Sequence, residues 1–178
     1  MSKNDVNMNR RHFLTVATTV AGAVGAGAIA VPFIASMQPS DRAIAAGAPV
    51  EVDLNKLETG AAMYTLWRGK SVVIVHRSKA MLARLKELED RLLDPDSSKP
   101  QQPEYANNTY RSRKPEFWVG ESVCTHLGCS PTYRPQVAPE DLGPDWPGGF
   151  FCPCHGSKFD LAGRVFENVP AQLNLVVP

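Results

Sequence analysis

The sequence has almost no net charge, since 19 lysines and arginines stand against 18 aspartates and glutamates, for a formal charge of +1. A nucleic-acid-binding surface needs an excess of positive charge, so the composition gives no indication of that class of partner. The chain also lacks a sustained heptad and any internal period, which excludes a coiled coil and a repeat array. Its 15 prolines and 13 glycines favour a loop-rich domain over a helical bundle.

Cysteine and histidine are scarce, with four of each in 178 residues. All four cysteines lie in two hexapeptides, CTHLGC at 124–129 and CPCHGS at 152–157, and each hexapeptide also holds a histidine. Thiolates and imidazoles gathered in this way suit a tetrahedral zinc site or an iron–sulfur cluster with mixed ligands. A spare cysteine pair can form a disulfide in an exported protein, and two disulfides without a metal is the alternative interpretation. Spacing alone does not distinguish ligand cysteines from bridging ones.

Charge is absent from residues 15–37. These 23 residues would span about 34 Å as a helix, enough for a hydrocarbon core of about 30 Å. Lys3, Arg10 and Arg11 precede the run, so we expect the N-terminus in the cytoplasm and the rest of the chain outside. The motif NRRHFLT, at 9–15, resembles a twin-arginine export signal. A buried core helix is the alternative interpretation of the run.

The apolar run is longer than an ordinary signal region of about 7–15 residues, which favours a retained membrane anchor. The glycines Gly22, Gly25 and Gly27 offer faces on which another helix can pack closely. The small-residue stretch AIAAGA, at 43–48, matches the alternative of a cleavage site. The segment QPSDRAIAAGAPV, at 38–50, is predicted to be a linker.

The remaining chain is expected to be rich in β-strands. EVDL at 51–54 has strand-like composition, and AMYTLW at 62–67 with SVVIVHR at 71–77 predicts a hairpin around Gly69. His76 ends that hairpin and is interpreted as a strand residue, with a metal ligand as the alternative.

One helix is predicted between Ser78, as its cap, and Pro95, as its stop. Its apolar stripe consists of Leu82, Leu85, Leu88, Leu92 and Leu93. Residues 97–115 are predicted to form a surface loop that faces a partner. Two further strands, EFWVGES at 116–122 and GGFF at 148–151, should lead into the two hexapeptides.

The two hexapeptides closely resemble the signature boxes of Rieske iron–sulfur proteins, of the disulfide-containing kind found in cytochrome bc1 complexes. The resemblance covers the whole chain and implies a mainly β fold. The expected head is an antiparallel β-sandwich with a small cluster-binding subdomain and one helix-loop insertion, joined to a single N-terminal transmembrane helix. The implied parts are a cytoplasmic segment at 1–14, an anchor at 15–37, a flexible hinge at 38–49, and a Rieske domain at 50–178 with its subdomain at about 120–160.

The resemblance also implies the roles of the cysteines and histidines. One [2Fe-2S] cluster would be bound by Cys124 and Cys152 on one iron and by His126 and His155 on the other. Cys129 and Cys154 would form the family's disulfide, which closes about 26 residues and is worth about 3–4 kcal/mol in the chain-entropy model.

Further residues take roles by the same resemblance. His155 would hydrogen-bond the quinol, with His126 beside it at an exposed tip and Leu127 shielding the cluster. Ser157 would donate to a cluster sulfur. Phe159 stands where relatives of highest potential carry a tyrosine, so we expect a lower potential here.

Two segments depart from the family pattern. VPAQ at 169–172 keeps only part of the family's proline-rich loop, which bears on the rigidity of that loop rather than on cluster binding. Relatives are also expected to continue past LNLVVP at 173–178 through further strands.

The implied function is electron transfer in a quinol–cytochrome c oxidoreductase, from quinol, expected to be ubiquinol, to cytochrome c1. The implied partners are cytochrome b, cytochrome c1, quinol and the membrane, in a dimeric complex, with no nucleic acid. The chain would cross a bacterial inner membrane once and place its Rieske domain in the periplasm.

Three other functions are alternatives. The first is the Rieske small subunit of another exported oxidoreductase, such as arsenite oxidase. A structural zinc module is the second. A Rieske ferredoxin or oxygenase domain is disfavoured by the second cysteine pair and by the 25 residues between His126 and Cys152.

Overall fold

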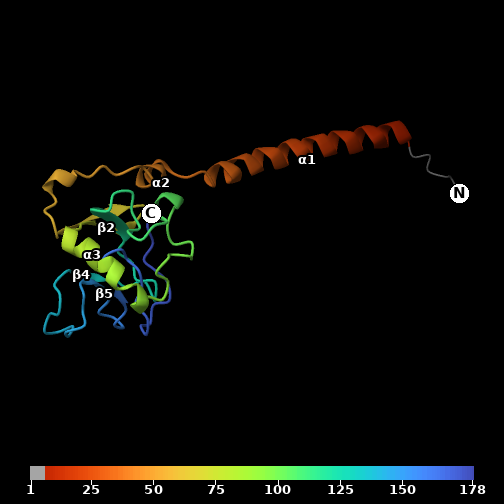
Figure 1. The fold of residues 1–178 in the computed structure, drawn as a ribbon. Helices are drawn as coiled ribbons and strands as arrows, with labels where there is room; N and C mark the ends of the chain where they lie inside the picture. The colour runs from red at the N-terminus through yellow and green to blue at the C-terminus, as the bar shows by residue number, and fades with distance from the viewer. Residues whose placement is uncertain (1–6) are drawn as a thin grey trace. The chain divides into compact units, whose positions relative to one another are not determined.

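The computed structural model describes residues 7–178, which fall into two compact units, one ending at Ala46 and the other spanning Gly47–Pro178 (Figure 1). Lys3, counted among the basic residues before the anchor, lies outside the described residues. Each unit is described by itself.

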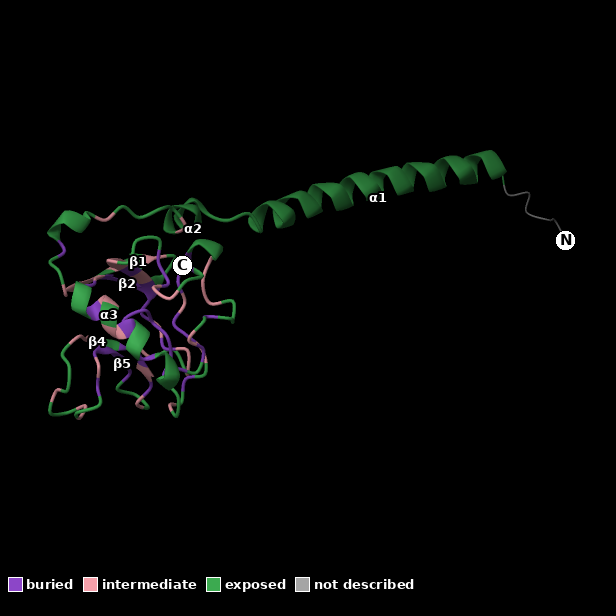
Figure 2. Cartoon of the chain, viewed as in Figure 1, coloured by how far each residue is buried: buried purple, intermediate pink, exposed green. Residues whose placement is uncertain are grey.

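The first unit is dominated by α1 (Met8–Ser36), a helix of 29 residues. The Asn7 side chain caps it by accepting a hydrogen bond from the Arg10 N–H at 3.1 Å, so the two arginines lie in its first turn. Every residue of α1 is exposed (Figure 2), and among residues 7–178 it provides the one helix long and apolar enough to cross a membrane.

A short helix, α2 (Asp41–Ala46), lies within the segment predicted to be a linker. The Ser40 hydroxyl accepts a hydrogen bond from the Ala43 N–H at 3.3 Å, which is a helix-capping interaction. The linker prediction overlooked this cap, and the alanines that follow it are strong helix formers.

The first antiparallel sheet contains β1 (Ala62–Trp67), β2 (Lys70–His76) and β3 (Phe117–Glu121), in that spatial order. Trp67 pairs with Lys70 across a two-residue turn in which Arg68 and Gly69 have φ of 50° and 75°. Positive φ at both positions is typical of a type I′ turn, whose twist matches the strands. The predicted hairpin is therefore present, with β2 beginning one residue earlier than expected.

The strand-like stretch EVDL forms no strand. Its last residue begins the 3₁₀ turn η1 (Leu54–Lys56), and the Asp53 side chain caps that turn by accepting the Asn55 N–H. A short polar side chain satisfies a local backbone donor here in place of a strand partner.

Helix α3 (Lys79–Glu87) begins where predicted, with Ser78 as its cap, but it ends well before Pro95. The chain continues through the 3₁₀ turn η2 (Glu89–Arg91). Leu92 then forms a β-bridge with Phe166, and the Leu93 N–H donates to the Val165 carbonyl at 3.0 Å. These tertiary hydrogen bonds replace helical ones. Leu93, which was predicted to belong to the apolar stripe of the helix, is 41% exposed.

The second antiparallel sheet contains β4 (Thr132–Arg134), β5 (Gly149–Phe151) and β6 (Lys158–Phe159). Gly149 is required by packing, because a Cβ there would lie 2.0 Å from the Phe159 carbonyl oxygen. The strands predicted to precede the two hexapeptides are β3 and β5. The expected fold class is therefore confirmed: two antiparallel sheets and one N-terminal apolar helix.

The core between the two sheets contains Val73 and Trp118 from the first sheet and Phe150 from the second. The Trp118 indole is fully buried against two glycines. A Cβ would lie 2.2 Å from it at Gly120 and 2.5 Å from it at Gly163. Close packing of this ring therefore requires glycine, which has no side chain, at positions 120 and 163.

Residues 97–115 do not form a purely surface loop, which corrects the prediction. The loop includes the 3₁₀ turn η3 (Glu104–Ala106), and Arg111 within it is fully buried. The Arg111 guanidinium donates to the carbonyls of Ala162 at 3.0 Å and Leu175 at 2.8 Å. A guanidinium can be buried when its N–H groups donate to carbonyl oxygens. The polar composition of residues 97–115 was therefore a poor guide to their exposure.

Two more arginines, Arg77 and Arg164, are buried in the same unit. Arg164 forms an ion pair with the buried Asp160 at 2.7 Å. Burial lowers the pKa of Arg77, and likewise that of Arg111, to about 10, although the nearby Asp160 carboxylate opposes this shift. Arg77 and Arg111 therefore remain charged at neutral pH, and all three guanidiniums donate to backbone carbonyls.

Candidate metal centre

The two hexapeptides occupy strand ends, as predicted. Residues 124–129 lie on the connection from β3 to β4 and so pass from one sheet to the other. Residues 152–157 join β5 to β6 within the second sheet. We call them the first and the second loop.

The two loops share one backbone turn. In the first loop the Cys124 N–H donates to the Cys129 carbonyl at 2.7 Å, and the Gly128 N–H donates to the Cys124 carbonyl at 2.9 Å. In the second loop Cys152 and Ser157 form the equivalent bond at 2.8 Å, and the fifth-position glycine, Gly156, donates at 2.9 Å. This repetition was missed by the sequence analysis, although a glycine at the fifth position of both hexapeptides was a visible signal.

The fifth position requires the left-handed conformation, with φ of 82° at Gly128 and 78° at Gly156. Glycine adopts this conformation without steric cost. The remaining positions differ between the loops: the histidine is third in the first loop and fourth in the second. One common turn therefore presents two different arrangements of side chains.

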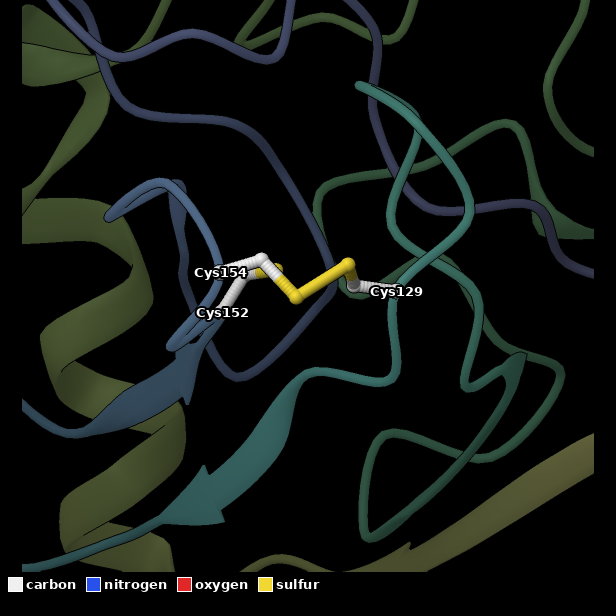
Figure 3. Close-up of side chains that lie close together, drawn as sticks. All are labelled: Cys129, Cys152 and Cys154. Atoms are coloured by element: carbon white, nitrogen blue, oxygen red, sulfur yellow. A yellow bond between two sulfur atoms is a disulfide. The ribbon is translucent and has the colours of Figure 1, made fainter.

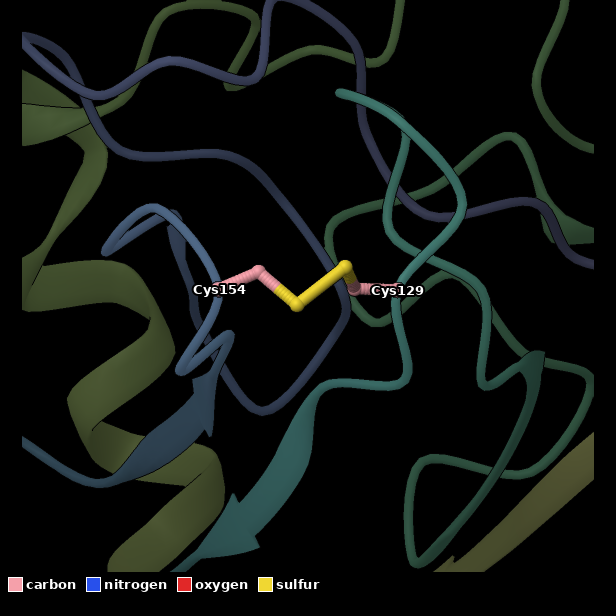
Figure 4. The surroundings of a disulfide bond; sticks show 2 residues. All are labelled: Cys129 and Cys154. Atoms are coloured by element: carbon pink, nitrogen blue, oxygen red, sulfur yellow. A yellow bond between two sulfur atoms is a disulfide. The ribbon is translucent and has the colours of Figure 1, made fainter.

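A disulfide joins Cys129 of the first loop to Cys154 of the second, as the Rieske resemblance implied (Figure 4). It connects the sixth position of one turn to the third position of the other. Cys124 and Cys152, at the first position of each turn, are free and buried. The bridge thus leaves one thiol per loop as a potential ligand.

The two free thiols lie together. Cys124 and Cys152 are 2% and 1% exposed and belong to the same core cluster. Burial raises the pKa of the Cys152 thiol, and the neighbouring Cys124 raises it further, although backbone N–H groups of the second loop oppose this. A pair of buried thiols requires a cation to become a pair of thiolates.

The two imidazoles also lie together. The rings of His126 and His155 have centroids 4.9 Å apart and an interplanar angle of 89°. His155 is exposed, whereas Nδ1 of His126 is buried and has no hydrogen-bond partner among residues 7–178. A buried ring nitrogen without a partner costs free energy, and a metal ion would supply the missing interaction. The residues present therefore fit a mixed thiolate and imidazole centre.

Both loops are tied to the segment that follows residue 168. The Ser157 hydroxyl, fully buried, accepts the Ala171 N–H at 3.1 Å. The Thr125 hydroxyl donates to the Leu173 carbonyl at 2.6 Å. Thr125 was not singled out by the sequence analysis, although its position between two candidate ligands was a signal.

A tyrosine also missed by the sequence analysis fastens the second sheet to the turn that precedes β1. The Tyr133 hydroxyl donates to the Gly60 carbonyl at 2.8 Å, and its ring packs on Phe150. Burial, with a smaller contribution from Tyr64, raises the pKa of Tyr133 to about 12, so the phenol keeps its proton at neutral pH.

The other predicted residues fall in distinct surroundings. Leu127 is 72% exposed beside His126, whereas Phe159 is fully buried in the core cluster that contains both free cysteines. His76 donates from Nδ1 to the Leu57 carbonyl at 2.8 Å and stacks on Phe117. This hydrogen bond and stacking give His76 the structural role that was predicted for it.

Comparison with known proteins decides the family. The family model "Rieske [2Fe-2S] domain" matches residues 98–177, and "Ubiquitinol-cytochrome C reductase Fe-S subunit TAT signal" matches residues 1–40. The chain is 62% identical over 178 residues to the ubiquinol-cytochrome c reductase iron-sulfur subunit of Allochromatium vinosum, covering 100% of this chain and 86% of the relative. The chain belongs to this family.

Rieske iron–sulfur subunits with lower identity are also similar along almost all of the chain. The subunit of Blastochloris viridis is 41% identical, covering 99% of this chain and 89% of the relative. The mitochondrial cytochrome b-c1 complex subunit Rieske of Neurospora crassa is 36% identical, covering 97% of this chain and 66% of the relative. The cofactor of this Rieske domain is a [2Fe-2S] cluster.

A solved chain described as "Hyperthermophilic respiratory Complex III" has the same fold. Its TM-score is 0.51 at 24% identity, covering 92% of this chain and 91% of that one. The Tat signal and the apolar α1 fit an exported, membrane-anchored subunit of a respiratory complex. These matches give no support to the alternative of an arsenite oxidase subunit.

Proposed function

We propose that this chain, an iron–sulfur subunit of a ubiquinol–cytochrome c reductase, carries single electrons from ubiquinol to cytochrome c1. The observation that supports this best is the pairing of two buried thiols with two adjacent imidazoles across a disulfide-clasped pair of loops. When bound, a [2Fe-2S] cluster supplies one-electron redox chemistry at a potential raised by its histidine ligands.

The two free cysteines and the paired histidines support the ligand set that the family resemblance implies. Cys124 and Cys152 would hold one iron through their sulfurs, and His126 and His155 would hold the other through ring nitrogens. The thiols are buried and His155 is exposed, so the histidine side of the centre faces solvent. An exposed imidazole that can exchange a proton is suited to accept the proton that a quinol hydroxyl releases on oxidation.

Two residues near the proposed ligands would influence quinol docking and the redox potential of the cluster. Leu127 projects beside His126 and would exclude water where quinol docks. Ser157 uses its oxygen to accept the Ala171 N–H, which leaves its own hydroxyl proton available for a cluster sulfur. Such a hydrogen bond stabilises the reduced, more negative state.

The N-terminal part would deliver the head to its partners. We place residues 1–14 in the cytoplasm, the anchor at 15–37 in the bacterial inner membrane, and residues 50–178 in the periplasm, with about 120–160 forming the cluster-binding subdomain. The arginines before the anchor support this orientation. Residues 38–49 would act as a hinge between cytochrome b and cytochrome c1 in a dimeric complex, with α2 as a short rigid piece within it.

Electron paramagnetic resonance of membranes that contain the full chain tests the centre. We expect the signal of a reduced Rieske cluster in the wild type and its loss in both His126→Gln and His155→Gln. His76→Gln is the matched control and should keep the signal, because His76 bonds a backbone carbonyl. Retention of the signal in either of the first two variants would show that the ligand assignment is wrong.

The direction of electron flow needs a second measurement. Rapid mixing with ubiquinol should reduce the cluster and then cytochrome c1 in the wild-type complex. Reduction of cytochrome c1 at the wild-type rate in membranes that carry His155→Gln would overturn the proposed path.

A further inference from the structure

Three positively charged side chains are buried around one carboxylate in the second unit. Arg77 is 2% exposed, and Arg111, Arg164 and Asp160 are fully buried. Burial lowers the pKa of Arg77 and Arg111, and the ion pair of the other two residues also acts on both values, so the four side chains interact electrostatically. We call these four residues the arginine group. Three positive charges against one negative charge give the group a net charge of +2.

The two other buried charges that the structure describes belong to carboxylates, and each has a lysine beside it. The Glu121 carboxylate accepts hydrogen bonds from the Lys70 ammonium at 2.8 Å. Burial raises the pKa of Asp94, but backbone and hydroxyl hydrogen bonds and then the charge of Lys99 lower it overall. Each carboxylate is therefore offset by its own lysine, and the arginine group keeps its excess of positive charge.

The arginine group is connected to the metal centre through the buried end of β6. Phe159, the last residue of β6, lies in the core cluster that also contains Cys152, whose sulfur is within 4.8 Å of both bridge sulfurs (Figure 3). The next residue is the carboxylate of the group, and the carbonyls of the two residues after it accept hydrogen bonds from Arg77 at 3.2 Å and Arg111 at 3.0 Å. Every residue at 159–166 is buried. Protein interior rather than solvent therefore lies along this path from the free thiols to the guanidiniums.

We propose that the net positive charge of the arginine group raises the reduction potential of the [2Fe-2S] cluster, an inference that rests on the proposed function. Reduction adds one negative charge to the cluster, so a positive charge nearby stabilises the reduced state. The net charge around an iron–sulfur centre is one of the quantities that set its potential. Buried charges act strongly because water and salt screen them little. The arginine group thus favours electron uptake by the cluster.

A structural role alone is the competing explanation, since the three guanidiniums also donate to backbone carbonyls. Removal of any charged member of the group should then lower stability, whichever sign its charge has. The electrostatic role makes a different prediction, because the potential must fall when an arginine is neutralised and rise when the aspartate is neutralised. The direction of the shift in potential therefore separates the two explanations.

Redox titration of the electron paramagnetic resonance signal, in membranes that contain the full chain, measures these shifts. Arg111→Gln should lower the ratio of reduced to oxidised cluster at a fixed ambient potential, and Asp160→Asn should raise it. A unit charge about 15 Å away, at an effective dielectric constant of about 20, changes such a ratio about sixfold. Arg113→Gln is the matched control and should leave the ratio unchanged, because Arg113 lies in the same loop but is exposed, over the Tyr105 ring.

A second arginine and a salt series keep the test decisive. Arg77→Gln carries the same expectation if Arg111→Gln does not accumulate with its cluster. The shifts should persist from low to high salt concentration, because buried charges are screened little. The proposal would be overturned by unchanged potentials in the arginine variant and in Asp160→Asn, by shifts of the same sign in both, or by shifts that disappear at high salt.

Failure of the proposed function would be recognised separately. If ubiquinol does not reduce the cluster in the wild-type complex, the proposed electron path is wrong, whatever the potentials of the variants. If ubiquinol reduces the cluster and the potentials of the variants nevertheless match the wild type, the inference about the arginine group alone is wrong.

Discussion

The first and second loops share a backbone turn but differ in exposure. In the first loop His126 is half-buried and only Leu127 and Gly128 project, whereas the second loop exposes Pro153, Cys154 and His155. The first loop passes between the two sheets, and the second joins neighbouring strands of one sheet. The comparison shows that the turn sets where the free thiols lie, while position within the turn decides which histidine reaches solvent.

The largest expected effect comes from separating the two loops. Replacing the bridge in Cys129→Ala/Cys154→Ala should lower the free energy of unfolding by about 3–4 kcal/mol, because the denatured chain regains the entropy of a closed loop. Denaturant unfolding of the variant against the wild type measures the change. An unaltered midpoint would mean that the common turns hold the loops together without their bridge.

The next largest effect on the free energy of unfolding should come from removing the hydrogen bond that each loop makes to the segment after residue 168. Ser157→Ala should lower the free energy of unfolding by about 1–3 kcal/mol, because it leaves the buried Ala171 N–H without an acceptor. Thr125→Val should lower it by about 1 kcal/mol, because Thr125 is only half-buried. Thermal unfolding measures both. A larger cost for Thr125→Val would reverse the ranking of the two loops.

The shared turn predicts equal effects at its fifth position. Gly128→Ala and Gly156→Ala should each cost about 1–2 kcal/mol, since both have positive φ and nothing lies within 4 Å of the added Cβ. Gly69→Ala is a control outside the loops, with φ of 75° and the same open surroundings. Clearly unequal costs at Gly128 and Gly156, measured by denaturant unfolding, would show that the two turns are not equivalent.

The smallest effect on stability should accompany a change in redox potential. Phe159→Tyr adds a hydroxyl in the core cluster that contains both free thiols, and a hydrogen bond to a cysteine sulfur worth about 0.5–1.5 kcal/mol would raise the potential by about 20–65 mV. Redox titration of the membranes measures it. Phe151→Tyr, outside that core cluster, is the control and should leave the potential unchanged, and an unchanged potential in Phe159→Tyr would count against the expectation drawn from the family.

Much of the local structure was predictable because its causes are local. Ser78 caps α3, Gly69 permits the hairpin turn, and β-branched residues form β2, all from interactions between near neighbours in the chain. The end of α3 was not predictable, since Leu92 and Leu93 leave the helix for partners at Phe166 and Val165. The burial of Arg111 was missed for the same reason, because the Ala162 and Leu175 carbonyls that accept from it lie more than 50 residues away.

The sequence by itself determined the apolar anchor, the pair of strands before the loops and the set of sulfur and nitrogen atoms from which a metal centre could be built. Residue type and short-range spacing suffice for these. The residues alone left the cysteine pairing open, and the Rieske resemblance implied the Cys129–Cys154 bond that the structure contains. Only the tertiary structure decided that Cys152 lies against this bridge and that the two loops repeat one turn. Those features depend on residues about 25 positions apart, brought together when the two sheets pack around their common core.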